Sequence, residues 1–193
     1  MVFPGAPVGD FGTAGWLGLA VTNYALVGAF LGIAEAARQH IVDQVKTRRK
    51  PPFDHVLAER PATQFQIAEI DVSLTAARAA LGRTGLMLDE HIARPDSELT
   101  QEDISDLMHQ WQCTKLIVNR AAADVVDRAL ALSGGSGYLS SSVLSRLYRD
   151  VRAGPFMQPI SPNEAFEFIG RVALGLEPDA EIRALLTRMK GER

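Results

Sequence analysis

Three long segments of this chain carry apolar residues at the three- and four-residue steps of an α-helix. They run from about residue 13 to 48, from 61 to 92 and from 100 to 133, and short polar or proline-containing stretches separate them. Helices of this length joined by short loops pack side by side in alternating directions, because each must bury an apolar stripe. The sequence therefore predicts an all-α fold, an antiparallel four-helix bundle with extra short C-terminal helices.

The composition is that of an ordinary folded domain. The chain has 193 residues, of which 47% are hydrophobic and 22% charged, with a net charge of −3. A chain of this length buries a proper core, and the charge balance gives no basic excess for nucleic acid. We expect an extended lead-in at residues 1–14, without the positive charge of a signal peptide, and a single helical domain at 15–193. The single cysteine, Cys113, and four scattered histidines indicate no disulfide and no metal site, and a cytoplasmic location is expected.

The first helical segment admits two interpretations. Residues 16–34 form a run of 19 uncharged residues that includes Gly28 and Gly32, close to the length of a membrane span. A helix that is apolar all round can instead lie in a protein core or an oligomer interface. The charged continuation through Glu35, Arg38 and Lys46 favours the second interpretation. We therefore expect no membrane association, with the glycines serving close helix contacts.

The second and third segments each have an apolar stripe that predicts a packing face. In the second segment the stripe at helical spacing is Phe65, Ala68, Val72, Ala76, Ala79 and Leu86. Its alanines, with Gly82 and Gly85, indicate close packing. In the third segment, Thr100 before Glu102 and Asp103 marks the helix start, and the stripe is Ile104, Leu107, Met108, Trp111, Leu116, Val118, Ala122, Val125 and Leu130.

The longest break in these helical periods is the stretch from Ser133 to Glu164. It holds the glycines Gly134, Gly135 and Gly137, a short arginine-rich helix at about 143–151, and a second break at Gly154-Pro155. The tetrad Ser161-Pro162-Asn163-Glu164 is a capping box with proline at the first helical position. It predicts a new helix that ends near Gly175, and 177–189 is expected as a terminal helix.

This arrangement resembles the C-terminal helical domain of the acyl-CoA dehydrogenase family of flavoproteins, including its flavin-dependent monooxygenase-like branch. The likeness rests on Gly-Gly-Ser-Gly-Tyr at 134–138, Arg-Leu-Tyr-Arg-Asp at 146–150, Gly-Ile-Ala-Glu-Ala-Ala at 32–37 and Gln-Phe-Gln-Ile-Ala-Glu at 64–69. It covers roughly residues 25 to 175. The resemblance implies part of an FAD-dependent oxidoreductase acting on acyl-CoA or related substrates, incomplete alone. It also implies a homo-oligomer, and missing N-terminal and β-domains supplied by a second chain or by a longer gene.

The resemblance also implies which residues contact the flavin. In the family, an Arg followed by an aromatic residue at the turn after the first helix reaches the flavin phosphates of a neighbouring subunit. That pair corresponds here to Lys50, or the adjacent Arg49, and Phe53. Gly134 and Gly135 would approach the adenosine diphosphate half through their backbone amides. The family commonly has a Gln three residues before the first glycine, where this chain has Ala131.

The catalytic residues are not identified by this resemblance. Many family members carry a glutamate base in a loop before the last helix, and the matching position here holds Gln158. An amide is not a base at neutral pH, which disfavours ordinary acyl-CoA dehydrogenation by this residue. Three alternatives stay open: a reduced-flavin-dependent monooxygenase component, a non-catalytic oligomeric bundle that kept the fold and lost the cofactor, and a membrane-anchored helical protein.

Overall fold

The fold is all-α, as the sequence predicts. The computed structural model describes residues 13–52, 54–95, 98–156 and 161–176. The elements in chain order are α1 (Thr13–Thr47), η1 (Leu57–Glu59), α2 (Pro61–Ile92), α3 (Gln101–Ser133), η3 (Gly134–Tyr138), α4 (Val143–Val151), η4 (Gly154–Phe156) and α5 (Pro162–Ala173). The expected bounds of these five α-helices are confirmed to within a residue or two, whereas the helix expected at 177–189 lies outside the described residues.

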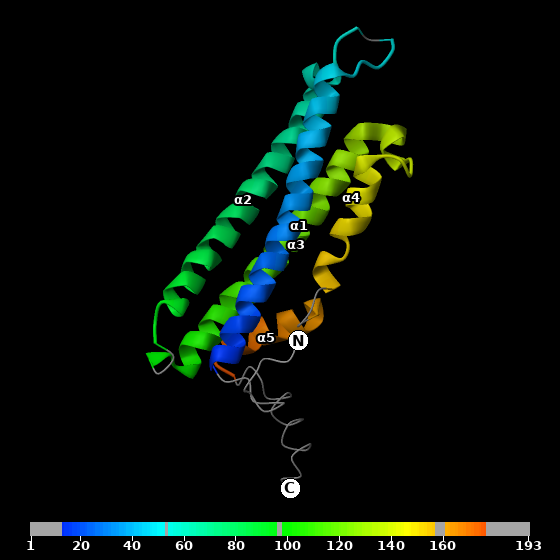
Figure 1. The fold of residues 1–193 in the computed structure, drawn as a ribbon. Coiled ribbons are helices and arrows are strands. Elements are labelled where there is room, and N and C mark those ends of the chain that lie inside the picture. The colour runs from blue at the N-terminus through cyan, green and yellow to red at the C-terminus, as the bar shows by residue number, and fades with distance from the viewer. Residues whose placement is uncertain (1–12, 53, 96–97, 157–160, 177–193) are drawn as a thin grey trace.

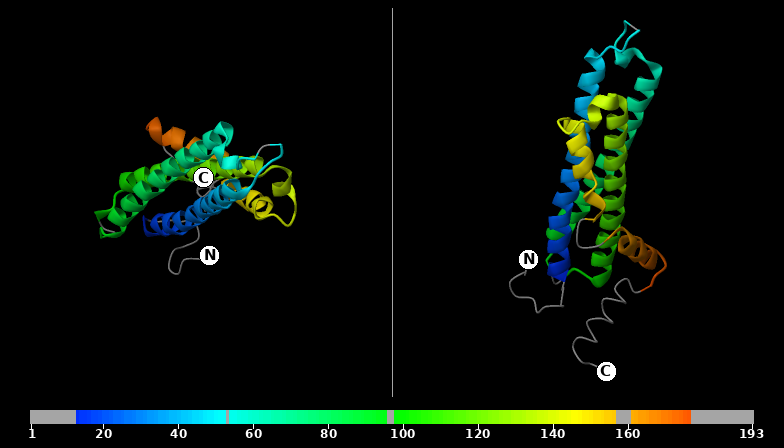
Figure 2. Two further views of the ribbon diagram at one scale, coloured as in Figure 1. Left: turned by 90° about the horizontal axis from the view of Figure 1, so that it is seen from above. Right: turned by 90° about the vertical axis from the view of Figure 1, so that its right-hand side faces the viewer.

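Three long helices form the body of the bundle, and α2 runs antiparallel to α1 and α3 (Figure 1). The fourth position is taken by α4, which has only nine residues and packs against α1 and α3. In the views of Figure 2, α4 covers the part of the bundle near the C-terminal end of α3, and α5 lies across the opposite end. The bundle is thus covered on the α4 side, while α2 forms its other edge (Figure 1).

The central element of the core is α3, which contacts α1, α2, α4 and α5. Its sequence-predicted stripe is buried at seven of nine positions, since Leu116 and Leu130 are only half-buried. From α1, the same core receives Val27, Leu31, Ala34 and Ile41, among others. From α4 it receives Leu144, Leu147 and Val151, which lie one helical turn apart. The apolar stripes of four helices therefore share one core.

The capping box predicted at the start of α5 is confirmed, and α3, whose start was predicted at Thr100, begins with a capping box as well. At α3 the Thr100 hydroxyl accepts from the Asp103 amide, and the Asp103 carboxylate accepts from the Thr100 amide. At α5 the same exchange joins Ser161 and Glu164. Arg94 donates to Asp103 as well, and these hydrogen bonds hold the pKa of that carboxyl well below its usual range. Each box satisfies amide groups that a helix start leaves unpaired.

The packing face predicted for α2 is wrong. Phe65, Val72 and Leu86 are 61%, 67% and 61% exposed, and the alanines of that stripe are exposed too. The buried residues of α2 are instead Thr63, Ile70, Leu74, Ala77, Thr84 and Leu88. Two apolar stripes run along α2, and periodicity does not tell which one faces the core. The stripe with the larger aliphatic residues and fewer alanines is the one that meets α1 and α3.

Close helix contacts were predicted at Gly28, Gly32, Gly82 and Gly85, and among these the described structure shows one at Gly85 only. A Cβ atom at Gly85 would lie 2.5 Å from Tyr24 Oη, and that hydroxyl donates to Leu81 O over 3.3 Å. Around Gly28, Gly32 and Gly82, no atom lies within 4 Å of the position of a Cβ. The prediction is therefore wrong for these three glycines within this chain, because they face away from the described neighbours.

Among the described helices, α1 is long and apolar enough to cross a membrane, from Ala20 to Thr47, a property that core helices of soluble proteins share. Two of its charged residues are paired across to α2: Arg38 with Asp71 at 2.8 Å and Glu35 with Arg78 at 2.7 Å. Its apolar residues pack against α3. Both features support the interpretation of α1 as a core helix, and the absence of membrane association stays a prediction.

A buried pair of hydroxyl groups between α2 and α3 tests this packing. Thr84 Oγ1 and Thr114 Oγ1 lie 2.7 Å apart, each side chain is 1% exposed, and Thr84 also donates to Ala80 O. Thr84→Val leaves the Thr114 hydroxyl buried without its acceptor and should lower the free energy of unfolding by about 1–3 kcal/mol. We expect the double variant with Thr114→Val to recover at least half of that loss in urea unfolding. Thr22→Val, at an exposed site on α1, serves as the control, and additive losses in the double variant would contradict this pairing.

Candidate functional site

The turn after α1 and the glycine stretch after α3 meet at one end of the bundle. Arg48 joins them, because its Nη1 donates to Ser133 O over 2.5 Å and to Ser136 Oγ over 3.1 Å. The carbonyl of Ser133 belongs to the last turn of α3, where a cation interacts favourably with the helix dipole. One side chain therefore brings together two segments that lie 85 residues apart in the sequence.

The turn after α1 presents two cations to solvent. Leu57 N donates to Arg48 O over 2.9 Å, and Arg49 pairs with Val56 in an isolated antiparallel bridge. The Arg49 guanidinium donates to Asp54 O, a hydrogen bond within the turn that stabilises its conformation. Arg49 and Lys50 are both exposed, next in sequence to the Arg48 that touches the glycine stretch. Phe53, the third predicted contact in this turn, lies outside the described residues.

The three glycines of the stretch after α3 have different roles. Gly134 ends α3 with φ at +66°, a conformation that residues with a Cβ rarely adopt. Gly134 and Gly135 are exposed, and no atom lies within 4 Å of a Cβ placed on either. Gly137 is buried, and a Cβ there would lie 1.8 Å from Ser133 Oγ. The first two leave the backbone accessible to a ligand, and the third is needed for packing.

This end of the bundle suits the anionic part of a flavin nucleotide. Its accessible groups are two exposed cations, Arg49 and Lys50, and the uncovered backbone at Gly134 and Gly135. Lysine offers phosphate a point charge and arginine a planar fork of donors, and backbone amides without side chains allow close approach. The contacts of Arg48 place the two segments side by side, whereas a direct contact between these cations and these glycines does not occur among the described hydrogen bonds.

Sequence reasoning missed Arg48 and Gly137. Three cations follow one another at 48–50, and the resemblance directed attention to the later two. The helical phase of α1 was the available signal, since Arg48 continues the buried series Ile41, Val45 by one turn. No signal in the sequence separates Gly137 from its two neighbours, because its tight contact comes from Ser133 folding back over the turn.

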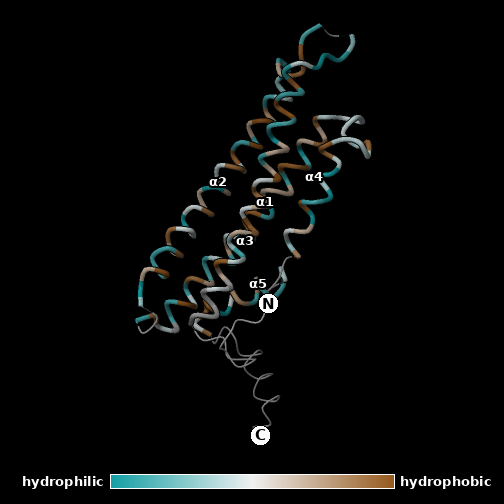
Figure 3. The backbone as a smooth tube through the Cα atoms, viewed as in Figure 1, coloured by the Kyte–Doolittle hydropathy of each residue, from teal (hydrophilic) through white to brown (hydrophobic). Residues whose placement is uncertain are grey.

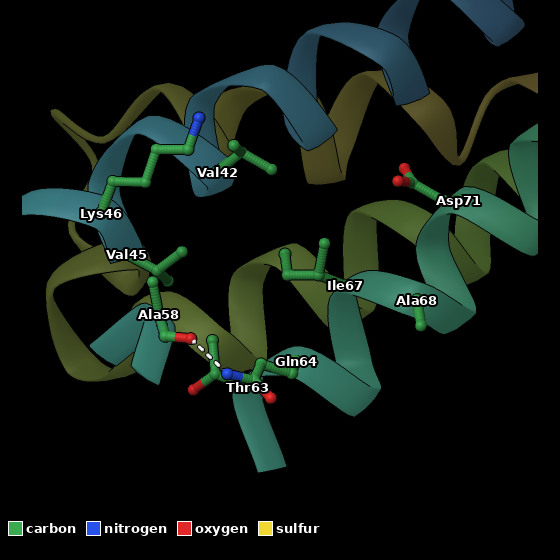
Figure 4. Close-up of a pocket in the computed structure, with 9 residues that line it drawn as sticks. All are labelled: Val42, Val45, Lys46, Ala58, Thr63, Gln64, Ile67, Ala68 and Asp71. Carbon is green, nitrogen blue, oxygen red and sulfur yellow. Dashed lines mark hydrogen bonds between the residues drawn. The ribbon is translucent and has the colours of Figure 1, made fainter. Parts of the chain in front are cut away.

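Two hollows lie near this end of the bundle, one between α1, η1 and α2 and the other between α2 and α3. One of about 370 Å³ lies between α1, η1 and α2 and is lined mainly by apolar groups, with Lys46 and Asp71 at opposite sides (Figure 4). Arg38 neutralises Asp71 and lowers its pKa through a side-chain hydrogen bond. The other, of about 410 Å³, is polar and is lined by Gln66, Asp124, Asp127, Arg128, Ala131 and Leu132. Ala131 therefore leaves space where the family commonly places a longer side chain.

A buried polar series runs along α3 toward α5. Lys115 is 3% exposed, its Nζ lies 5.6 Å from the centroid of the Trp111 ring, and burial lowers its pKa. Asn119 Nδ2 donates to Gly154 O over 3.2 Å. Asn119 Oδ1 and both amide atoms of Gln112 are buried without a hydrogen-bond partner. Buried polar groups in proteins are usually hydrogen-bonded, so these three amide atoms are groups that a bound water or ligand would satisfy.

Gln158 lies in the sequence between two residues that this series contacts, Gly154 and Glu164. Asn119 contacts Gly154 before it, and Lys115 interacts with the Glu164 carboxylate after it. Gln158 itself lies outside the described residues. Sequence reasoning missed this series because Lys115 and Asn119 stand at helical spacing among apolar residues and resemble ordinary breaks in a stripe.

The described residues hold no cluster of three His, Cys, Asp or Glu side chains that could bind a metal ion. Cys113 is half-buried on α3, and burial raises the pKa of its thiol. A thiol with a raised pKa is a weak nucleophile at neutral pH. Neither a metal centre nor a cysteine nucleophile is therefore indicated in the described part of the chain.

The fold is that of flavoprotein helical domains. The family model for the acyl-CoA dehydrogenase C-terminal domain matches residues 24–158, and the chain belongs to this family. Amino sugar nitrososynthase DnmZ of Streptomyces peucetius is 34% identical over 91% of this chain, and RubN8 of Streptomyces rubradiris, with the same activity in its name, is 36% identical over 89%. Acyl-CoA dehydrogenases and a dibenzothiophene monooxygenase also match, at lower identity over shorter stretches.

The solved structures agree with this assignment. KijD3, in complex with FMN and dTDP-3-amino-2,3,6-trideoxy-4-keto-3-methyl-D-glucose, superposes with a TM-score of 0.77 at 36% identity, covering 89% of this chain and 40% of KijD3. The chain spans 44% of DnmZ and 39% of RubN8, less than half of each relative. What is matched is thus the C-terminal helical domain of a larger type of flavoprotein.

Gly137 and Gly135 form a matched pair for testing the loop. Gly137→Ala should lower the free energy of unfolding by about 1–3 kcal/mol, because the added methyl group meets Ser133 Oγ and Leu130 in a packed turn. Gly135→Ala has open space around it and should stay within about 0.5 kcal/mol of the parent chain. Thermal and urea unfolding of both variants measure the difference. Equal stabilities would mean that the turn is looser than its contacts indicate.

Proposed function

We propose that this chain is the helical domain of a reduced-flavin-dependent oxygenase that oxidises the amino group of a nucleotide-linked amino sugar. The observation that carries the proposal is the extent of similarity to nitrososynthases, which reaches about nine-tenths of the chain at 34–36% identity. The KijD3 complex, with FMN and a dTDP-linked amino sugar, supports the same class of ligands.

The residue at the family's usual base position also supports an oxygenase over an acyl-CoA dehydrogenase. Abstracting the α-proton of an acyl thioester needs a carboxylate, and Gln158 has none. Oxygenation of an amine has no such requirement, because the nitrogen lone pair is itself the nucleophile. The acyl-CoA substrate inferred from the family resemblance is therefore the less favoured alternative.

The chemistry balances with a reduced flavin and dioxygen. One round takes a primary amine to a hydroxylamine: one oxygen atom of O₂ enters the N–H bond, the other leaves as water, and the flavin gives up two electrons. A second round, with another O₂ and another reduced flavin, takes the hydroxylamine to the nitroso compound and releases two molecules of water. The bound flavin supplies these electrons and activates dioxygen.

The residues of this chain would hold the cofactor rather than react. Arg49 and Lys50 would meet a phosphate of the flavin, with Phe53 beside them, and Gly134 and Gly135 would offer backbone amides. We propose FAD or FMN as the flavin and a homo-oligomer as the assembly. The remaining domains would come from a second chain or from elsewhere in a longer protein, since the matched relatives are more than twice as long.

The test is made on the purified chain in two steps. The first measures binding of oxidised and reduced FMN and FAD by quenching of flavin fluorescence and by the visible spectrum of the size-exclusion peak. The second supplies a flavin reductase, NADH and a dTDP-linked amino sugar, and follows oxygen incorporation at the amine by mass spectrometry. Oxidation of an acyl-CoA instead of the amino sugar would favour the acyl-CoA dehydrogenase interpretation. Absence of binding to both FMN and FAD would favour a helical bundle that has lost its cofactor.

A bulky residue at Gly135 should separate flavin binding from folding. Gly135→Trp fills the open space over an exposed backbone and should weaken flavin binding at least about tenfold, because the phosphate can no longer approach the amide. The melting temperature should change little, since the site is exposed and uncrowded. Tyr138→Trp, at a nearby residue that is 83% exposed, is the matched control. A parallel fall in affinity and in stability would identify the stretch as a plain turn.

A further inference from the structure

The outer side of α4 carries three exposed arginines at three-residue steps, Arg146, Arg149 and Arg152. Among the described residues, no carboxylate forms an ion pair with any of them. The Arg149 guanidinium donates instead to a hydroxyl group of its own helix, Ser145 Oγ, over 3.0 Å. We call these three side chains the arginine face of α4.

The fold turns the arginine face away from the core. Leu144, Leu147 and Val151 are buried on the opposite side of α4, which packs against α1 and α3. Hydrophilic residues recur along α4 in Figure 3, and α4 lies at the outer side of the bundle in Figure 1. Residues three apart on a helix are neighbours, with about 5–6 Å between their Cβ atoms. The three guanidinium groups can therefore converge on one ligand.

Helix stability does not account for all three cations. The helix dipole favours cations in the last turn, which suits Arg149 and Arg152. Arg146 stands in the first half of α4, towards the end where the dipole disfavours a cation, and like charges at this spacing repel each other. Asp150 is the one acidic residue of α4, and it forms no ion pair with the arginine face. A bound anion would remove this repulsion.

The composition of the arginine face favours a small phosphorylated ligand over a macromolecule. The centre of a protein interface is rich in aromatic and apolar residues, whereas Ser142, Ser145 and Ala153 lie between these arginines. A nucleic acid needs a wide basic surface, and this chain has a net charge of −3. Guanidinium groups donate two parallel hydrogen bonds to a phosphate. Neighbouring guanidinium groups can thus each hold one phosphate of a linked pair.

We propose that the arginine face of α4 binds the diphosphate of a nucleotide-linked substrate. Because α4 packs against η3, this face lies at the end of the bundle that carries the glycine stretch. The inference goes beyond the proposed function, because a diphosphate occurs both in a dTDP-linked amino sugar and in coenzyme A. The arginine face holds the substrate under either reaction and takes no part in the chemistry.

Binding of inorganic pyrophosphate to the purified chain tests the site. Arg149→Gln removes the central guanidinium and should weaken binding at least about tenfold, because charge-assisted hydrogen bonds are lost. Arg146→Gln and Arg152→Gln should weaken binding in the same direction. Arg83→Gln makes the same change of charge at an exposed site on α2 and should leave the affinity nearly unchanged. Titration calorimetry at constant ionic strength measures the affinities, and circular dichroism confirms that each variant keeps its melting temperature.

Two results of this titration would overturn the proposal. One is a parent chain that binds neither pyrophosphate nor a nucleotide diphosphate, and the other is an equal loss of affinity in Arg83→Gln and in the α4 variants. Arg149→Lys then separates geometry from charge. Lysine keeps the cation without the planar fork of donors, so less than half of the lost affinity should return. Full recovery would contradict the paired hydrogen bonds on which the assignment of a diphosphate rests.

Competition with pyrophosphate identifies the source of the diphosphate. Displacement by dTDP at least about tenfold more strongly than by dTMP supports a nucleotide sugar, and a preference for coenzyme A over phosphopantetheine supports a thioester. A loss of FAD affinity in the α4 variants as large as the loss of pyrophosphate affinity would assign the arginine face to the cofactor and overturn the proposal. FMN binding tests the proposed cofactor site and should stay unchanged in these variants, so the failure of one proposal is distinguishable from the failure of the other.

Discussion

Burial of α3 is the interaction on which the rest of this structure depends. Among the described helices, α3 packs against each of the other four, and its stripe from Ile104 to Ala129 is buried except at the half-buried Leu116. At about 25 cal/mol for each Å² of apolar surface removed from water, that contact outweighs the few ion pairs at the surface. The two long partners, α1 and α2, are joined to each other by the ion pairs Arg38–Asp71 and Arg78–Glu35 and by the contact of Tyr24 with Leu81.

The same core determines where ligand-binding groups can lie. Because α1 and α3 run in the same direction, their C-terminal ends reach the same end of the bundle (Figure 1), and Arg48 closes the gap between them. That places exposed cations and uncovered glycine backbone on a rigid base, as a phosphate site requires. Midway along α3, the buried amides of Gln112 and Asn119 and the ammonium group of Lys115 face η4 and α5, on either side of the segment that carries Gln158 in the sequence. The bundle thus carries exposed cations at one end and a buried polar series within its apolar body.

The position of this chain within its family follows from its length. It covers less than half of the nitrososynthases that it resembles, and its exposed cations and glycines form an edge rather than an enclosed pocket. Exposed groups of this kind form an enclosed binding site only when another domain or chain covers them. The exposed glycines at one end and the exposed apolar residues along α2 are both surfaces of this kind.

Much of the fold and part of the site follow from the sequence alone. Helix bounds were predictable because their signals are local: Thr100 and Ser161 cap the helices they begin, and glycine with positive φ at Gly134 ends α3. Family membership followed from short motifs around the glycines. Tertiary structure alone decided which stripe of α2 turns inward. The stripe with Phe65 and Leu86 and the stripe with Ile70 and Leu74 both follow the helical repeat, and only packing against α1 and α3 shows which one is buried. Tertiary structure alone also decided that Arg48, and not Arg49 or Lys50, joins the two loops, because its partner Ser133 lies 85 residues away in the sequence. Gly137 is a packing glycine because Ser133 folds back over the turn, which the sequence does not show.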